Sequence, residues 1–393
     1  MTHQSWRPFL MVSLALCIGT IGTALASPLY PIYQELWHLL PSQITYIFVA
    51  YMFGCLATLL FLGRTSNTFG YLRTLQMGMI CVVAGLILSV MAVDAMWLSF
   101  GRFIIGIASG LISTSAMLGL IITIPESHKK NAPQLSSIIT VIGFGFGPLV
   151  GGMIAQFSDY PLVSPYLPII VAALLCFVGL FKLKSPQFEL QPFSVAPHLE
   201  LPTVQYRSGF FVASLTAFCA FGIFGLFASL SPSFVKDLIP WHGPLVSGIA
   251  ISSILFISAL VQFFSRSFSA IKCLNYGLLM LSVSLVLLAL CISMQWSILF
   301  FLSDIFVGIG HGLSLMGAFG LIHQMTTTYN RAAVMSTYLF IGYLGTIVPI
   351  IVVGYLADHF GLTLGILSFC LSILLLCSTL WLWHKKLACK NYK

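Results

Sequence analysis

The stretch MWLSFGRFIIGIASGLISTSAMLGLIITI, residues 96–124, decides the fold of this chain. A helix needs about 20 predominantly apolar residues to cross the hydrocarbon core of a bilayer, and this run exceeds that length. It carries a single charge, Arg102, near its beginning. Because a charge at bilayer depth is costly, we expect Arg102 to face protein or a water-filled cavity.

The composition places the whole chain in the same class. Of its 393 residues, 59% are hydrophobic and only 7% are charged, whereas soluble domains carry about 25% charged residues. The ten cysteines form no CxxC motif and no Cys/His cluster, so we expect neither a metal site nor a disulfide framework. We therefore predict an all-α integral membrane protein.

Proline, glycine and clusters of charge divide the chain into twelve apolar runs, which we interpret as transmembrane helices. The first run has a second interpretation, because Arg7 precedes it and ALA at 24–26 resembles a signal-peptidase site. The run continues to Pro31, which is long for the apolar part of a signal peptide and favours a span. The twelve runs are 8–31, 44–62, 72–93, 96–124, 134–157, 166–183, 208–231, 244–264, 274–293, 296–322, 333–356 and 362–383.

The basic residues orient these spans. With the N-terminus inside, 15 of the 17 lysines and arginines lie on cytoplasmic segments, as the positive-inside rule requires. Only Lys236 lies outside, and Arg102 lies within a span. We expect a multi-pass protein of the inner (plasma) membrane with both termini in the cytoplasm. The net charge of +8 is then a topology signal with a weak attraction to anionic lipid, and no nucleic-acid partner is expected.

The chain divides into two similar halves. When the sequence is shifted by 202 residues, RFIIGIASGL (102–111) lies on DIFVGIGHGL (304–313), and GMIAQF (152–157) lies on GYLADH (354–359). Chance similarity between apolar segments is the alternative, but the shared glycine spacing and the matching order of spans favour a repeat. Two six-helix bundles in one orientation, related by a pseudo-twofold axis along the membrane normal, suit alternating access.

A polar, proline-rich stretch separates the halves and is typical of an extended linker. We predict an N-terminal six-helix bundle over residues 1–183, a cytoplasmic linker over 184–206 and a C-terminal six-helix bundle over 207–393.

Three stretches resemble the major facilitator superfamily. The loop GRTSNTFGYLR (63–73) is similar to a family signature between spans 2 and 3, although Asn67 stands where Asp is usual. RFIIGIASG in span 4 is similar to the family's buried arginine followed by glycines. GFGFGPLVGG (143–152) in span 5 resembles the Gly-Pro-x-x-Gly-Gly signature associated with exporters, especially proton-driven antiporters. The resemblance implies the major facilitator fold of twelve transmembrane helices in two pseudo-symmetric bundles.

Arg102 and its repeat-mate Asp304 are the obvious formal charges deep inside spans. At 1.5 Å per residue they lie about 9 Å and about 12 Å from the outer ends of spans 4 and 10, so their depths are comparable. We predict that they balance each other beside a shared aqueous cavity and that Asp304 carries the coupling proton. The alternative is a structural ion pair, or local partners only.

His311 follows Asp304 by two helical turns, on the same face of span 10 and about 10 Å deeper. An imidazole changes charge near neutral pH, so the two residues predict a short proton route. The alternative is a neutral, hydrogen-bonded packing residue.

The glycines of span 5 form a smooth stripe on one helix face, because Gly143, Gly147 and Gly151 recur at intervals of four. Pro148 removes one backbone hydrogen bond and bends the helix, and Gly152 completes the motif. We interpret the stripe as a flexing seam that limits leakage, with helix packing alone as the alternative.

The remaining candidate residues lie at the cytoplasmic ends of spans. Arg331 opens span 11, where it caps the preceding helix or clamps an intracellular gate. The candidate gate comprises Gly63, Asn67, Gly70, Arg73 and Arg331.

The function that we predict is secondary active transport. There is no phosphate-binding loop, no HExxH and no Gly-x-Ser-x-Gly in a suitable context, so we expect neither an enzyme nor a cofactor. We predict proton-coupled export of a small amphipathic molecule by a monomer in the lipid bilayer, with protons as the coupling ion. The alternatives are uptake of a sugar or organic acid by symport, and a non-transporting membrane receptor.

Overall fold

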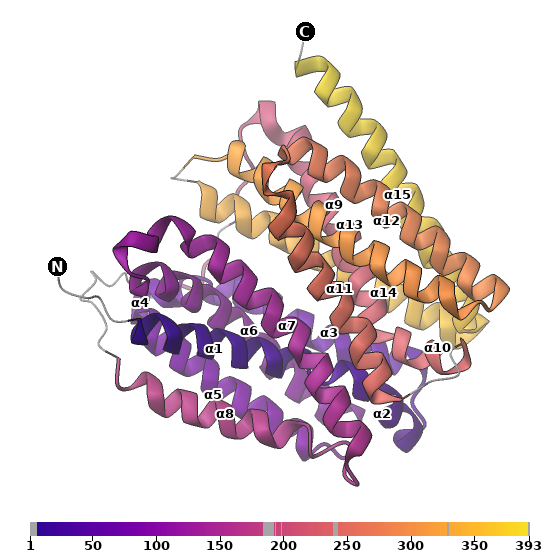
Figure 1. Cartoon of the computed structure of the whole chain (residues 1–393), viewed down its shortest axis with the longest axis horizontal. Helices are drawn as coiled ribbons and strands as arrows, with labels where there is room; N and C mark the ends of the chain where they lie inside the picture. Colours follow the sequence, from indigo (N-terminus) through magenta and orange to yellow (C-terminus); the bar gives the residue numbers. More distant parts are fainter. Residues whose placement is uncertain are drawn as a thin grey trace. The chain divides into compact units, whose positions relative to one another are not determined.

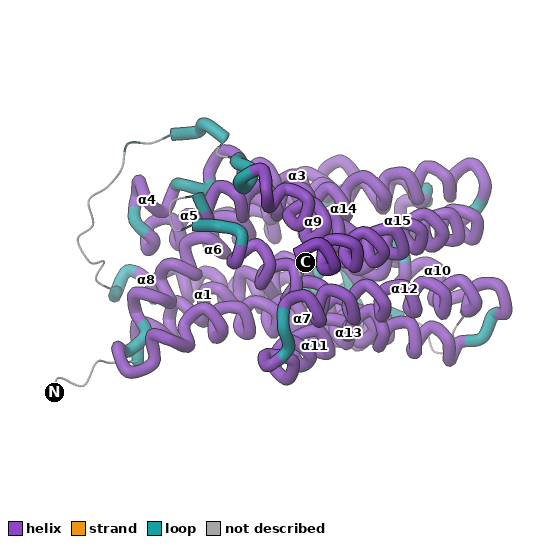
Figure 2. The backbone as a smooth tube through the Cα atoms, turned by 90° about the horizontal axis from the view of Figure 1, so that it is seen from above, coloured by secondary structure: helices purple, strands orange, loops and turns teal. Residues whose placement is uncertain are grey.

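The computed structural model describes residues 6–183, 192, 194–197, 199–238, 243–327 and 330–391 of the chain. Throughout these residues the regular secondary structure is helical, as Figure 2 shows along the backbone. Within the predicted linker, residues 184–191, 193 and 198 lie outside the described residues. The fold class predicted from hydropathy is confirmed, because long apolar helices make up the described residues. Such helices satisfy most of their backbone hydrogen bonds internally, as lipid requires.

The chain divides into two compact units (Figure 1). Unit 1 comprises Met1–Trp37 and Ala50–Pro197. Its longest helices pack as neighbours in pairs, with α5 beside both α6 and α8, and α1 beside both α6 and α7. The elements of unit 1 are α1 (Arg7–Ala24), η1 (Ser27–Leu29), α2 (Tyr30–Trp37), the second part of α3 (Pro41–Ala57), η2 (Thr58–Leu62), α4 (Thr65–Phe69), α5 (Tyr71–Val90), α6 (Ala95–Thr123), η3 (Glu126–Asn131), α7 (Ala132–Phe157) and α8 (Tyr166–Leu180).

Unit 2 comprises His38–Val49 and His198–Lys393. In this unit α13 packs between α11 and α12, while α14 packs against α9 and α15. The elements of unit 2 are the first part of α3, η4 (Val204–Tyr206), α9 (Arg207–Ser229), α10 (Ser231–Leu238), α11 (Pro244–Phe264), η5 (Ser265–Ser267), α12 (Ala270–Met294), α13 (Ser297–Gln324), α14 (Arg331–Phe360) and α15 (Leu362–Asn391).

The predicted spans correspond to helices of the structure, and one of these helices is much shorter than the others. Among the described residues, eleven helical stretches are long and apolar enough to cross a membrane. The sixth predicted run, 166–183, forms the shorter helix α8 of 15 residues, which begins after Pro165. Its helical length is about 22 Å, because each residue of an α-helix rises 1.5 Å.

The first span is continuous from Arg7 to Trp37 but changes its helical geometry in the middle. Pro28 and Pro31 lack the backbone N–H that an α-helix needs at these positions. The chain therefore tightens into the 3₁₀ turn Ser27–Leu29 before α2 begins.

The repeated glycines perform the same task in each unit. On α6, a Cβ added to Gly106 would lie 2.9 Å from the Cα of Gly54 on α3. On α13, a Cβ added to Gly308 would lie 2.8 Å from the Cβ of Ile257 on α11. Both glycines thus allow the fourth helical span of their half to pack closely against the second, which explains the spacing shared by the halves.

Helix α3 contributes to both units, and sequence analysis gave no indication of this. In unit 2 its first turn packs on α14, where the Ser42 N–H donates to the Asp358 carboxylate over 3.0 Å. A Cβ on Gly354 would lie 2.9 Å from the Cα of Ser42. A carboxylate at the N-terminus of a helix is favourable, because the first backbone N–H groups have no partner within the helix.

Candidate functional site

Arg102 lies on α6 in the interior of unit 1, with only 1% of its surface exposed. Its Nη1 donates to the backbone carbonyl of Thr23 at the end of α1, over 2.7 Å. The guanidinium also lies over the Tyr51 ring of α3, with 5.1 Å from Cζ to the ring centroid. Three helices therefore hold this cation away from lipid, as expected for a charge at bilayer depth.

Buried tyrosines surround this cation. Tyr30, Tyr33 and Tyr166 are each at most 1% exposed and lie within electrostatic reach of Arg102. The hydroxyls of Tyr33 and Tyr166 lie 3.1 Å apart, which links α2 to α8. The ring of Tyr51 adds a cation–π contact, which favours the charged guanidinium in a dry setting.

The hydrogen bonds of Arg102 are incomplete. Its Nε has no hydrogen-bond partner among the described residues, although it is fully buried. A buried donor without a partner costs about 1–3 kcal/mol, and more when the group is charged.

Asp304 lies on α13 in unit 2 and is 4% exposed. One carboxylate oxygen accepts a hydrogen bond from Ser253 Oγ on α11, and the other, Oδ1, has no partner among the described residues. Ser253 Oγ also lies 2.7 Å from the carbonyl of Ala250, one turn earlier.

This arrangement suits both protonation states of Asp304. The Ser253 hydroxyl has one proton and two acceptor lone pairs. When Asp304 is charged, Ser253 donates to it. When Asp304 holds a proton on the same oxygen, it donates to Ser253 Oγ, whose own proton turns to the Ala250 carbonyl. The site therefore keeps its hydrogen bonds in either state.

His311 lies on the same helix, is 6% exposed, and is fixed by a polar chain on α11. Its Nδ1 lies 3.0 Å from Ser258 Oγ, which accepts a hydrogen bond of 3.1 Å from Gln262 Nε2. Ser258 Oγ therefore links His311 Nδ1 to Gln262, and either the hydroxyl or the imidazole can be the donor in its bond to Nδ1. The rings of Phe221 and Phe224 on α9 flank the imidazole, with centroids 6.0 Å and 5.7 Å away.

The two charges that sequence analysis paired thus have separate local partners in separate units. Asp304 and His311 share one face of α13 and both contact serines of α11, so the structure brings these two together on one pair of helices. Arg102 belongs to unit 1, and its partnership with Asp304 stays a prediction.

The glycine stripe of α7 packs on α1 inside unit 1. A Cβ on Gly147 would lie 2.8 Å from both the Cβ of Ala24 and the carbonyl oxygen of Ile21. Gly143 and Gly151 meet α1 in the same manner, at Thr20 and Leu25. Pro148 lies inside the helix, and Gly152 is buried beside it.

A matching contact in unit 2 was not foreseen. Gly345 on α14 packs against the backbone of Phe218 on α9, and α14 also contains an internal proline, Pro349. Gly345 lies 202 residues after Gly143, the same shift that aligns the halves. Because the repeat aligns Gly345 with Gly143, comparing the two halves at this position would have predicted a glycine contact in unit 2.

The candidate gate residues lie on short turns at helix ends. Gly63 ends the π-helical turn η2, and exposed Asn67 lies on α4. Gly70 has a φ of 81°, a left-handed conformation that favours glycine, and is the N-cap of α5, where Arg73 is exposed. In unit 2, Arg331 begins α14, and its Nε donates to Thr326 Oγ1 over 3.4 Å. This contact of Arg331 is local, near the end of α13.

Sequence analysis did not identify the hydrogen-bond partners in these sites. Ser253 and Ser258 are polar residues in an apolar span, five apart, and this spacing was the available signal. The Thr23 carbonyl gives no signal, because every residue has one. Within the described residues no group of three or more His, Cys, Asp or Glu side chains is placed to hold a metal ion.

Comparison with known proteins places this geometry in a family. A family model described as Major Facilitator Superfamily matches residues 12–350. Among solved structures, a bacterial homologue of the human lysosomal transporter Spinster, in an inward-facing and occupied conformation, superposes with a TM-score of 0.74 at 15% identity, over 98% of each chain. The inward-facing, unoccupied form of that protein gives a TM-score of 0.69 at 16% identity.

Three curated proteins are similar over part of the chain. The riboflavin transporter RibZ of Clostridioides difficile is 21% identical over 48% of this chain. The chromaffin granule amine transporter of Rattus norvegicus is 24% identical over 44%, and multidrug resistance protein 2 of Bacillus subtilis is 25% identical over 38%. The chain spans 41%, 34% and 38% of the lengths of these relatives, respectively.

Proposed function

Because this chain belongs to the major facilitator superfamily, we propose that it is a proton-coupled antiporter that exports a small amphipathic molecule across the inner membrane. It is a multi-pass membrane protein and a transporter by family and fold, rather than an enzyme. Beyond membership of the family, the proposal specifies the coupling ion, the direction of transport and the chemical class of the substrate.

The observation that carries the proposal is the environment of Asp304. A carboxylate inside the bilayer costs several kcal/mol unless it is paired or protonated. Ser253 accommodates both states, and the second oxygen of Asp304 has no partner among the described residues. A proton taken up there changes the charge of unit 2 by one while its hydrogen bonds persist.

His311 extends the site along α13. Its imidazole lies two turns beyond Asp304 on the same face, held by Ser258. A neutral imidazole can accept a proton at one ring nitrogen and release one from the other, so in this proposal His311 relays protons. Arg102 in unit 1 keeps its charge throughout, because a guanidinium is not deprotonated in proteins.

In the proposed cycle, Asp304 takes a proton from outside in the outward-open form. Neutralisation favours the inward-open form, and substrate entering from the cytoplasm favours release of the proton inward. The proton can drive this exchange because it binds the two states with different affinity. The stripe of α7 on α1 acts as a seam that flexes while remaining closely packed.

Transport of small molecules is supported by the names of all three relatives, and the name of one of them, multidrug resistance protein 2, favours export. To test direction, cells expressing the chain and matched cells lacking it are loaded with ethidium and with riboflavin, and their media are surveyed for metabolites. We expect faster efflux of at least one compound, abolished by a protonophore. Greater accumulation in expressing cells would establish uptake instead and overturn the proposed direction.

A further inference from the structure

A groove opens on the surface of unit 2 between α12 and α15, which pack side by side (Figure 1). Its volume is about 300 Å³. Leu279 and Leu382 at its edge are 45% and 55% exposed, so the groove faces the hydrocarbon that surrounds a membrane-spanning helix pair. The residues that line it are Leu278, Leu279, Ser282, Ser378, Trp381 and Leu382.

The two hydroxyls in this groove are already satisfied. Ser282 Oγ donates to the Leu278 carbonyl, and Ser378 Oγ donates to the Leu374 carbonyl, each over 2.8 Å. Because neither hydroxyl needs an outside acceptor, a hydrocarbon chain can lie in the groove without leaving a buried donor unpaired.

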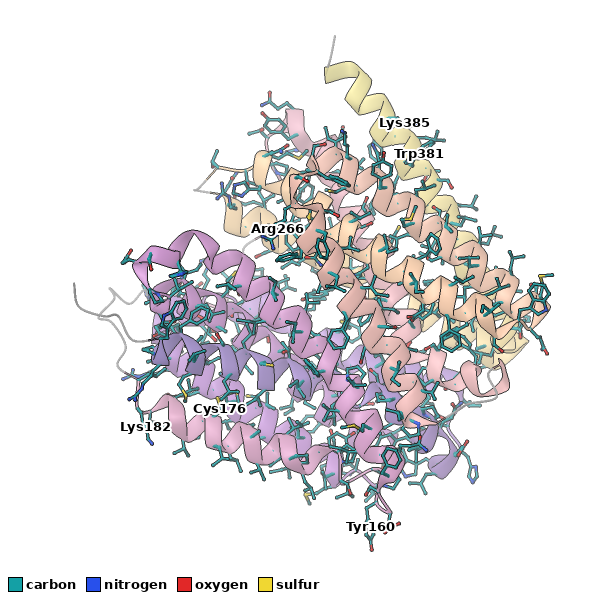
Figure 3. All side chains as sticks on the ribbon, viewed as in Figure 1. Tyr160, Cys176, Lys182, Arg266, Trp381 and Lys385 are labelled. Atoms are coloured by element: carbon teal, nitrogen blue, oxygen red, sulfur yellow. The ribbon has the colours of Figure 1, made fainter. Side chains whose placement is uncertain are left out.

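Positive charge marks one end of the groove. The Lys385 ammonium lies 3.6 Å from the centroid of the Trp381 ring, one turn earlier on α15. Figure 3 shows both side chains near the free end of this helix. A cation–π contact of this kind holds a flexible lysine in place while leaving its N–H groups for an anion. Lys385 is exposed.

A second lysine lies at the same end. Lys272 is exposed in the first turn of α12. In the predicted topology α12 and α15 cross the membrane in opposite directions, so the start of α12 lies at the same side as the end of α15. Lys272 shares a helix face with Leu279, two turns away, so it lies about 10 Å from the groove wall along the helix axis. Lys385 lies about 5 Å beyond Leu382. An apolar slot thus leads to a pair of cations near the depth of lipid headgroups.

We propose that this groove binds an anionic phospholipid of the inner leaflet, with an acyl chain between α12 and α15 and the phosphate at Lys385 and Lys272. The predicted topology places this end at the cytoplasm, where the leaflet is anionic and each nearby lysine strengthens attraction. Charge complementarity thus favours an anionic lipid over a zwitterionic one. This site does not depend on the transport proposal.

The test uses the purified full chain in detergent, titrated with brominated phosphatidylglycerol or brominated phosphatidylcholine while tryptophan fluorescence is recorded. Bromine quenches a nearby indole, and subtracting the Trp381→Phe signal isolates the groove. We expect quenching by phosphatidylglycerol to reach its midpoint at a lower lipid concentration than quenching by phosphatidylcholine, which indicates tighter binding. Each of Lys385→Gln and Lys272→Gln should weaken it about fivefold, because one lysine contributes about 1 kcal/mol near an anionic surface.

Two further variants control the experiment. Lys182→Gln removes an exposed lysine at the end of α8 in unit 1 and should leave the titration unchanged. Ser378→Leu fills the groove and should weaken quenching by both lipids. Equal affinity for the two lipids, no effect of either groove lysine, or the same loss with Lys182→Gln would overturn the proposal.

Discussion

Replacing Gly147 by alanine tests the closely packed seam between α7 and α1. The added Cβ would lie 2.8 Å from the Cβ of Ala24 and from the carbonyl oxygen of Ile21, whereas ordinary contacts begin at 3.4 Å. The helices must therefore separate by roughly half an ångström, because the Ile21 oxygen is backbone and cannot rotate away. Overpacking of this kind costs about 1–3 kcal/mol.

Alanine also favours the helix by about 1 kcal/mol relative to glycine, so the net loss for Gly147→Ala is about 0–2 kcal/mol. Gly179→Ala on α8 is the matched control, because its Cβ would meet only the terminal methyl of Met11, which can move. Gly179→Ala should therefore gain stability from the higher helix propensity of alanine, with little steric penalty. The expected difference between the two variants is therefore about 1–3 kcal/mol.

The assay is thermal unfolding of both purified variants in one detergent, followed by transport in proteoliposomes of the compound identified in cells. We expect Gly147→Ala to melt several degrees below Gly179→Ala, and its transport per folded molecule to fall. Equal melting temperatures would refute the packing argument. A lower melting temperature with full transport per folded molecule would show that the stripe only packs.

Two other substitutions separate function from stability. Arg102→Met should change the unfolding free energy by no more than about 1 kcal/mol, because removing the unpartnered Nε offsets the loss of the hydrogen bond to the Thr23 carbonyl. It should nevertheless abolish coupled transport. A variant that fails to fold would show that the arginine is structural. Asp358→Asn should lower the free energy of unfolding by about 1 kcal/mol, because the amide oxygen still accepts from the Ser42 N–H but without charge assistance. This variant should keep coupled transport. Loss of coupling would place a second proton site at Asp358.

Hydropathy and charge were sufficient to predict the fold class, because lipid requires each span to satisfy its own backbone hydrogen bonds. They also indicated that Arg102 and Asp304 would be shielded from lipid, since an intramembrane charge must face protein or water. The aqueous cavity shared by the two charges stays a prediction. The C-terminal end of α8 was predicted three residues too late, because the apolar Phe181 and Leu183 continue the run into the turn after Leu180.

The hydrogen-bond partners of the buried polar groups could not be predicted from the sequence. The Ser253–Asp304 and Ser258–His311 bonds join residues 51 and 53 positions apart, and no local pattern encodes that separation. The start of α3 belongs to unit 2, where Gly354 packs against Ser42, and this is likewise a long-range contact. Periodicity in the sequence indicates which face of a helix carries the buried or polar residues, whereas tertiary packing decides which residues contact that face.

Asp304→Asn, reconstituted in proteoliposomes with a trapped pH dye, addresses proton coupling most directly. An inward-directed proton gradient is imposed, and both proton entry and movement of the exported compound against its own gradient are recorded, with Asp358→Asn as the matched carboxylate control in the same unit. The variant should still exchange substrate at equilibrium but show neither uphill movement nor substrate-dependent proton entry. Uphill movement at the wild-type rate would contradict the assignment of the coupling proton to Asp304.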